Sequence, residues 1–316
     1  PSEVTINGDV VLEIAFTSSG GLSFVKLAGD VYCMSKTSER PTAPVKGDIV
    51  MLYDNENKVF DANANIKINA YSVVTGLGTV KFHIEPGIWY LAVGKPSSRN
   101  TISILNLVSA TSYFMVGNEI ELASAPPHEI QNILNQGASL APRDNGALST
   151  GSGFCAGAAL NSNFDKQIGF NDFSIHAAYS FGLGFDMMMI NYGKNGYCSG
   201  TNDKIGMNGW LAEGSMYLWM SGSLDIRGNI PVPSICYEQV CVLGVCGDVP
   251  YPCMANKEFN QPIFTAAVAA MVKGKLPKPI YFSGDFACYY DVMGILKGNY
   301  SFHYDYGKNC TPVKSL

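Results

Sequence analysis

One stretch of the chain, from Phe173 to Ile190, carries the hydrophobic pattern that best predicts the fold. Its odd positions are all apolar or aromatic, whereas its even positions are mostly small or polar as far as Met188. Successive side chains of a strand point to opposite faces, so the pattern predicts one long amphipathic strand or two strands in one line. An unbroken strand would be about 55 Å long at roughly 3.3 Å per residue, so we expect a bend at Gly182 or Gly184.

Similar strand-length alternation recurs along the rest of the chain. Residues 10–17, 79–85 and 216–226 alternate in the same way, and a turn is expected at 76–78. The only helical pattern lies near 126–136, where Pro residues precede an apolar stripe and Gly137 ends it. The sequence therefore predicts an all-β fold. We expect large twisted antiparallel sheets packed as a sandwich or flattened barrel, with one short helix near 126–136.

The predicted helix divides the chain into two parts. Residues 1–125 are expected to form an N-terminal β meander, and 126–150 a short helix and linker. Residues 151–316 form a C-terminal β region with a cysteine-rich insertion at 230–261. One continuous domain is the alternative, because 316 residues suit either one large all-β domain or two smaller ones.

Composition and charge argue against nucleic acid as a partner and against a membrane-spanning helix. The chain is 47% hydrophobic and 15% charged, below the roughly 25% charged residues of ordinary soluble domains. The net charge of −5 and the absence of basic runs argue against nucleic acid as a partner. No stretch has the roughly 18 consecutive apolar residues that a spanning helix needs, so no membrane-spanning segment is expected.

The cysteine pattern indicates the redox environment of the protein. Four of the nine, Cys236, Cys241, Cys246 and Cys253, follow the spacing C-x4-C-x4-C-x6-C. Tight C-x2-C pairs typical of zinc sites are missing, so disulfides are favoured over a metal site or free thiols. Disulfides would imply an oxidising compartment. An odd number of cysteines leaves at least one as a thiol or bound to another molecule.

No motif indicates catalysis. The chain has no G-x-S-x-G, no H-E-x-x-H, no Walker loop and no G-x-G-x-x-G that opens a helix. No enzyme activity, cofactor or metal is therefore expected. Met187–Met189 and the aromatic ladder fit either a ligand surface or core packing between two sheets, and core packing is favoured. Four aromatic residues are candidates for an exposed contact surface for glycans or proteins: Tyr217, Trp219, Tyr289 and Tyr304.

Several ordered blocks of the chain resemble a known group of proteins. The blocks include GGLSFVKLAGDVYCM, PVKGDIVMLYD, GSGFCAGAAL, FGLGFDMMMINYG and GILKGNYSFHYDYGKNC. Together they resemble the conserved C-terminal-type region of very large surface proteins of Bacteroidota, and the resemblance covers nearly the whole chain. It implies a secreted or surface-displayed protein. Cys198 and Cys310 stand at positions that match the family and are further disulfide candidates. The chain departs from the family at Tyr300, where a Cys is usual, while Cys288 lies on the preceding strand.

These observations favour a non-enzymatic, extracellular structural or adhesive module of a cell-surface or filament-forming protein. Its expected partners are other subunits, remaining domains of a large surface protein, and glycans. One alternative is a carbohydrate-binding or carbohydrate-active β-sandwich. A second is an outer-membrane β-barrel, since Phe173–Met189 alternates like a lipid-facing strand. The aromatic face of this strand is expected to pack against equally apolar neighbours. Its small polar face is expected to meet water, a short loop or another subunit.

Overall fold

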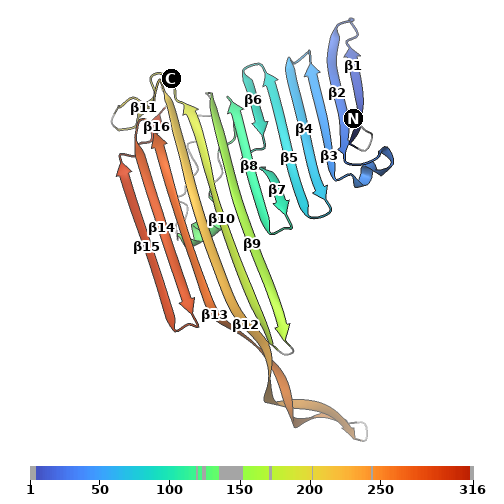
Figure 1. Ribbon diagram of the computed structural model, residues 1–316, viewed down its shortest axis with the longest axis vertical. Coiled ribbons are helices and arrows are strands. Elements are labelled where there is room, and N and C mark those ends of the chain that lie inside the picture. The colour runs from blue at the N-terminus through green and yellow to red at the C-terminus, as the bar shows by residue number, and fades with distance from the viewer. Residues whose placement is uncertain are drawn as a thin grey trace.

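The computed structural model describes residues 5–118, 120–122, 126–134, 152–170, 173–200, 202–242 and 245–313. Within these ranges the chain forms one antiparallel sheet of 14 strands and a separate two-stranded sheet (Figure 1). The large sheet runs in the order β1-β2-β3-β4-β5-β6-β8-β9-β10-β12-β13-β14-β15, and β7 pairs with both β5 and β8. The predicted all-β class with large antiparallel pairing is confirmed.

The front of the sheet is a meander of neighbouring hairpins. Its strands are β1 (Ile6–Phe16), β2 (Leu22–Cys33), β3 (Val45–Asp54), β4 (Val59–Ala70), β5 (Val74–Glu85), β6 (Ile88–Val93), β7 (Asn100–Ile104) and β8 (Val108–Gly117), with a short 3-10 helix at Thr37–Thr42. The expected turn at 76–78 lies inside β5. The chain instead turns just before it, where Tyr71 and Ser72 both have positive φ angles.

The back of the sheet consists of longer strands. They are β9 (Gly153–Phe170), β10 (Phe173–Asn191), β12 (Trp210–Val242), β13 (Val245–Leu276), β14 (Tyr281–Val292) and β15 (Leu296–Gly307). The small second sheet pairs β11 (Tyr197–Cys198) with β16 (Pro312–Val313). The helix α1 (His128–Ile133) falls within the predicted segment; residues 135–136 and the predicted linker up to 150 lie outside the described residues.

The strands lie side by side in one layer instead of in two stacked sheets. β8 pairs with β9 from Val108↔Ser162 to Gly117↔Gly153, so front and back strands belong to the same sheet. The cysteine-rich insertion is a continuation of β12 and β13, which pair beyond the sheet and form a protruding two-stranded arm (Figure 1). The predicted sandwich arrangement is therefore replaced by a single broad sheet with an arm, within the confirmed all-β class.

β10 runs through the sheet without the expected break. It extends from Phe173 to Asn191 and pairs along its length with β9 and β12. The two glycines at which a bend was expected serve to make room for neighbouring side chains. A Cβ at Gly182 would lie 2.5 Å from Trp219 Nε1, and one at Gly184 would lie 2.7 Å from Tyr217 Oη. These glycines are therefore explained by close packing and not by a change of strand direction.

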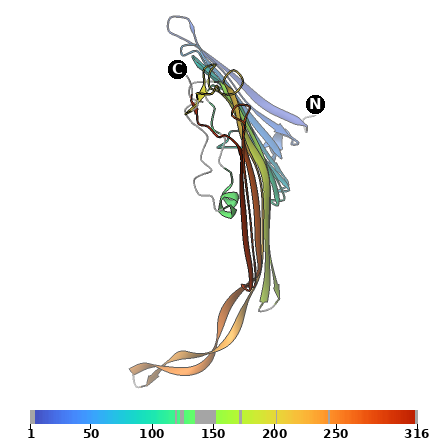
Figure 2. The same ribbon diagram turned by 90° about the vertical axis from the view of Figure 1, so that its left-hand side faces the viewer.

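One face of the sheet is covered and the other is bare. In Figure 2, α1 and the small sheet of β11 and β16 lie on the same side of the large sheet, and no described helix or strand lies on the other side. Beneath α1, Ile130 packs with Tyr217 and Trp219. A second buried cluster joins Met188 and Ile190 of β10 to the segment around the disulfide Cys198–Cys310.

The burial of β10 is the reverse of the expectation. The small and polar even positions lie under the cover, and Asp186, Met188 and Ile190 are at most 1% exposed. The aromatic positions on the other face remain exposed, with Tyr179 at 49% and Leu183 at 45%. The physical reason is that no second sheet packs over the aromatic face in the described ranges. No helix in these ranges is long and apolar enough to cross a membrane.

Candidate functional site

The two faces of the sheet have different chemistry, and this difference is the main candidate for function. Residues paired in an antiparallel ladder point to the same side, so strand pairings define rows that cross the whole sheet. One row contains no polar side chain: Ile6, Cys33, Val45, Ile68, Gly76, Ile102, Ala110, Leu160, Leu183, Leu218, Ala270, Phe286 and Phe302. We call the side to which it points the apolar face.

The neighbouring row points the other way, to what we call the polar face. Its residues are Asn7, Tyr32, Lys46, Lys67, Leu77, Thr101, Thr111, Ala159, Gly184, Tyr217, Met271, Asp285 and His303. A shift of one residue along each strand thus changes an uncharged surface into one with lysines, a histidine and a carboxylate.

Charge separates almost completely between the two faces. Across the paired strands of the sheet, with the arm excluded, Lys166 is the single charged side chain at an apolar-face position. The polar face of the same strands carries Asp9, Glu13, Lys26, Asp30, Lys46, Asp48, Asp54, Asp61, Lys67, Lys81, Glu85, Asp165, Asp186, Glu213, Asp225, Arg227, Lys273, Lys275, Asp285, Asp291, Lys297 and Asp305. The signal is visible in the sequence as strand alternation, but it becomes a surface property only once the register is known.

The apolar face contains a shallow groove. It has a volume of about 960 Å³ and is lined across β8, β9, β10 and β12 by side chains such as Ala110, Leu160, Leu183 and Leu218. Its lining combines large side chains such as Phe185 and Met216 with the small side chains of Ala158 and Ala270. The lining offers hardly any hydrogen-bonding groups, so the groove suits hydrocarbon better than a polar ligand.

A buried ion pair anchors the loop after β6 to the polar face. Arg99 Nη2 lies 2.7 Å from Asp186 Oδ1, and the Tyr113 hydroxyl donates to the same oxygen at 2.8 Å. Gly157 lies beside both, and a Cβ there would collide with Asp186 and Tyr113. Burial, followed by the charge of Asp186, raises the pKa of Tyr113, so this phenol stays protonated. The cluster joins the loop after β6 to β8 and β10.

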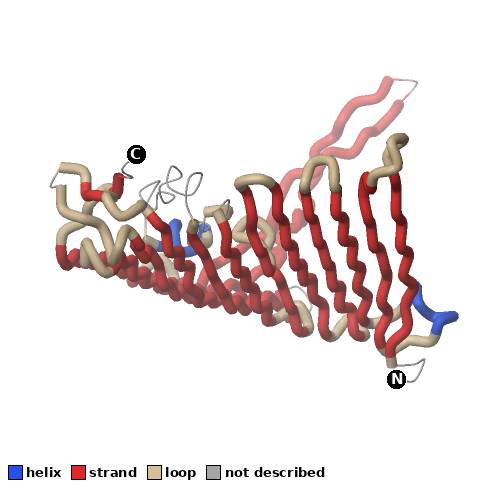
Figure 3. The backbone as a smooth tube through the Cα atoms, turned by 90° about the horizontal axis from the view of Figure 1, so that it is seen from above, coloured by secondary structure: helices blue, strands red, loops and turns tan. Residues whose placement is uncertain are grey.

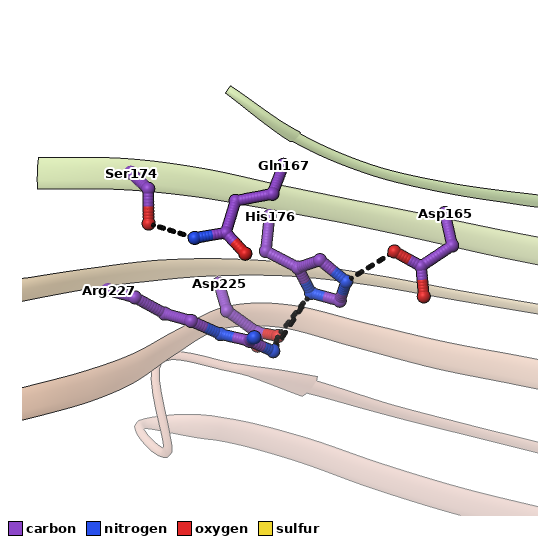
Figure 4. A network of polar contacts seen from close by, with 6 residues as sticks. All are labelled: Asp165, Gln167, Ser174, His176, Asp225 and Arg227. Carbon is purple, nitrogen blue, oxygen red and sulfur yellow. Dashed lines mark hydrogen bonds and ion pairs between the residues drawn. The ribbon is translucent and has the colours of Figure 1, made fainter. Parts of the chain in front are cut away.

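His176 is held between two carboxylates on the polar face (Figure 4). Its Nε2 lies 2.8 Å from Asp165 and its Nδ1 lies 3.2 Å from Asp225, while Arg227 lies 3.6 Å from Asp225. Hydrogen bonds to Asp225 and then to Asp165 raise the pKa of His176. The ring on β10 lies between Asp165 on β9 and Asp225 on β12, and so links three neighbouring strands.

The same arrangement occurs at two other histidines. His303 contacts Asp285 at 2.6 Å and Asp305 at 3.0 Å, and hydrogen bonds to these two groups, Asp285 first, raise its pKa. His83 contacts Asp61 at 2.8 Å. Each histidine bonds carboxylates on its own or adjacent strands, so these rings link strands of the sheet. Within the described ranges no group of three His, Cys, Asp or Glu residues is placed to hold a metal ion.

The six candidate disulfide cysteines form three bonds. They are Cys198–Cys310, which closes the cover of the sheet, and Cys236–Cys253 and Cys241–Cys246, which cross the arm between β12 and β13. Cys33, Cys155 and Cys288 are thiols. Three disulfides indicate an oxidising environment.

The four candidate aromatic residues do not form one surface. Tyr217 and Trp219 are only 5% and 4% exposed, because α1 packs over them. The prediction of an exposed surface is wrong for these two. Tyr289 and Tyr304 are exposed at 42% and 55%, but they lie on opposite faces of the sheet. No stacking platform for a glycan is formed by these residues.

Both ends of the sheet are open edges. The outer edges of β1 and β15 pair with no other strand in the described ranges. β1 exposes large apolar side chains on both faces, including Val10 at 68% and Val11 at 64%. A long apolar edge strand presents unpaired backbone groups and is a template for pairing with another strand.

Comparison of the chain with models of known protein families, with curated proteins and with solved structures finds no match. Function is therefore inferred from the residues of this chain alone.

Proposed function

We propose that this chain is a non-enzymatic structural module of an extracellular or cell-surface protein. It works as a broad β-sheet scaffold, and it contacts further subunits or domains through the edges of that sheet. The observation that carries the proposal is the 14-stranded sheet with two open edge strands, of which β1 exposes large apolar side chains such as Val10 and Val11 on opposite faces. The three disulfides support an oxidising location outside the cytoplasm.

The buried and charged groups support a scaffolding role. The conspicuous polar clusters, at Asp186, His176 and His303, tie strands or loops to one another and face no apolar groove. Their hydrogen bonds stabilise the sheet over its width. The resemblance to large surface proteins of Bacteroidota agrees with this role and remains a prediction about origin.

Assembly through the β1 edge is tested with the variant Val11→Lys. This residue lies on the polar face of the edge strand, so a lysine there blocks edge pairing without changing the apolar face. We expect sedimentation velocity over a concentration series to show assembly of the unchanged chain, and Val11→Lys to weaken it at least about tenfold in the concentration required.

The matched control is Val249→Lys, which changes a residue of the arm that is 49% exposed and lies far from β1. It should leave assembly unchanged. A chain that stays monomeric at every concentration, or an assembly equally weakened by both variants, would contradict the proposed role of the edge.

A further inference from the structure

The apolar face is too large to be an ordinary part of a water-exposed surface. Along the sheet path, thirteen strands spaced about 4.8 Å apart make the face roughly 60 Å wide. About nine residues of each central strand make it roughly 30 Å high, giving an area near 1,800 Å². The largest apolar patch of a typical monomer is about 300–600 Å². An exposed apolar face of this size is typical of an interaction site.

The chemistry of the apolar face limits the kind of partner that it can bind. Its single charged side chain is Lys166, and its most exposed residues include Met216 at 68%, Met220 at 55% and Phe302 at 53%. A partner with charged or hydrogen-bonding groups would lose the hydration of those groups and gain no bond in return. The complement of this surface is another uncharged, apolar material.

The shape of the face distinguishes a second copy from lipid. The sheet is twisted, and the front strands are turned relative to the back strands when seen from above (Figure 3). Two rigid sheets pack face to face only if their twists match and the side chains of both interdigitate, which places a strict geometric requirement on a second copy. Fluid hydrocarbon follows a twisted surface and also fills the groove of about 960 Å³ between Leu183 and Ala110.

We propose that the sheet docks through its apolar face onto the hydrocarbon of a lipid bilayer, with its polar face left in water. The binding strength comes from burial of apolar area, as for other amphipathic elements at a membrane surface. This inference rests on the proposed scaffolding function, because it identifies the partner of one face of that scaffold. The lipid-facing interpretation of Phe173–Met189 from the sequence is thereby extended from one strand to the whole face.

Vesicle flotation tests the proposal. The purified chain is mixed with vesicles of phosphatidylethanolamine and phosphatidylglycerol in a 3:1 ratio and centrifuged through a density gradient. We expect the unchanged chain to float with the vesicles. The variant Phe302→Lys puts a charge on the apolar face and should weaken partitioning at least about tenfold. The matched control Ser301→Lys changes the adjacent exposed residue on the polar face and should float normally.

Quenching of tryptophan fluorescence tests which face of the sheet contacts the lipid. Trp89 is 41% exposed on the apolar face, whereas Trp219 is 4% exposed beneath α1. Single-tryptophan chains are made by changing the other two tryptophans to Phe. Vesicles containing brominated lipid should quench the fluorescence of Trp89 strongly and that of Trp219 hardly at all.

Three outcomes would overturn the proposal. In the first, the chain stays in the dense fractions. In the second, Phe302→Lys and Ser301→Lys float alike. In the third, brominated lipid quenches both tryptophans equally. A dimer that forms without vesicles, is broken by Phe302→Lys and does not float would assign the face to a second copy. The edge variant Val11→Lys keeps the apolar face intact. It should float even if edge assembly is disproved, so failure of the scaffold proposal and failure of lipid binding give different results.

Discussion

The two faces of the sheet are made by the same strands, yet they are stabilised in different ways. On the polar face, charged side chains bond one another across strands, and α1 and the disulfide-closed segment bury an apolar cluster over part of the sheet. On the apolar face, large side chains lie exposed with no described element over them. Internal packing therefore lies on the side richer in charge. The more hydrophobic side is left exposed.

The two faces differ in burial because the tertiary contacts lie on the polar face. Met271 and Val272 are neighbours in β13, but Met271 is 1% exposed under the cover and Val272 is 50% exposed. Burial of a side chain stabilises a fold in proportion to the apolar area removed from water. The polar face therefore contributes most of the stability of the isolated chain. Under the lipid docking proposed above, the apolar face would contribute only when lipid covers it.

The largest effect is expected at the buried ion pair of the polar face. Asp186→Ala removes the anion that faces Arg99 and Tyr113 in a buried site, and we expect a loss of about 3 to 5 kcal/mol in the free energy of unfolding. Urea unfolding measures this loss. The matched change Asp165→Ala removes a carboxylate whose side chain is 77% exposed, so it should cost below about 1 kcal/mol. Equal losses would mean that burial does not set the importance of these charges.

The next effect separates the faces at neighbouring residues. Met271→Ala empties a packed site beneath α1 and should cost about 2 to 4 kcal/mol in the free energy of unfolding. Val272→Ala removes a half-exposed side chain on the apolar face and should cost below about 1 kcal/mol. Urea unfolding of both variants without lipid provides the measurement. A larger loss for Val272→Ala would show that the apolar face is already covered in the isolated chain.

The smallest effect is a dependence of stability on pH that comes from the polar face. Hydrogen bonds to Asp225 and Asp165 raise the pKa of His176, and those to Asp285 and Asp305 raise the pKa of His303. The folded-state pKa thus exceeds the unfolded value of about 6.5. The stabilisation is complete below that unfolded value and is lost as the pH rises through the folded pKa.

Thermal unfolding followed by circular dichroism should therefore show Tm falling as the pH is raised from about 6 to about 9, and the double variant His176→Asn, His303→Asn should reduce this fall. The control Gln167→Ala removes a hydrogen bond to Ser174 beside His176 without removing a titrating group, and it should keep the dependence. A slope of opposite sign, or one unchanged in the double variant, would contradict this role for the histidines.

Local alternation allowed much of the secondary structure to be predicted, and misses occur where a local signal had a different cause. Gly182 and Gly184 suggested a bend, yet they are small because Trp219 and Tyr217 lie against them from β12. The turn at Tyr71 and Ser72 has no glycine or proline, so its position depends on the pairing of β4 with β5. Tyr217 and Trp219 seemed exposed because α1 lies far from them in sequence.

The candidate sites were harder to predict than the strands. Asp186 is a carboxylate among apolar residues, but its partner Arg99 is 87 residues away, and no local pattern joins them. The carboxylates around His176 come from neighbouring strands, so the cluster exists only in the observed register. The cysteine spacing indicated disulfides in the arm but not their pairing, because four cysteines permit three connectivities.

By itself, the sequence determined that the chain forms amphipathic antiparallel strands with one short helix, since side chains alternate with the period of a strand. It also determined that nearly all charged residues of each strand occupy alternate positions, with Lys166 as the exception. Only the tertiary structure decided that the uncharged positions align into one face, because strand register, and not composition, places Leu183 beside Leu218 and Leu160. It alone decided which face is covered, because α1 and the Cys198–Cys310 segment dock onto the polar side through contacts between residues distant in the chain.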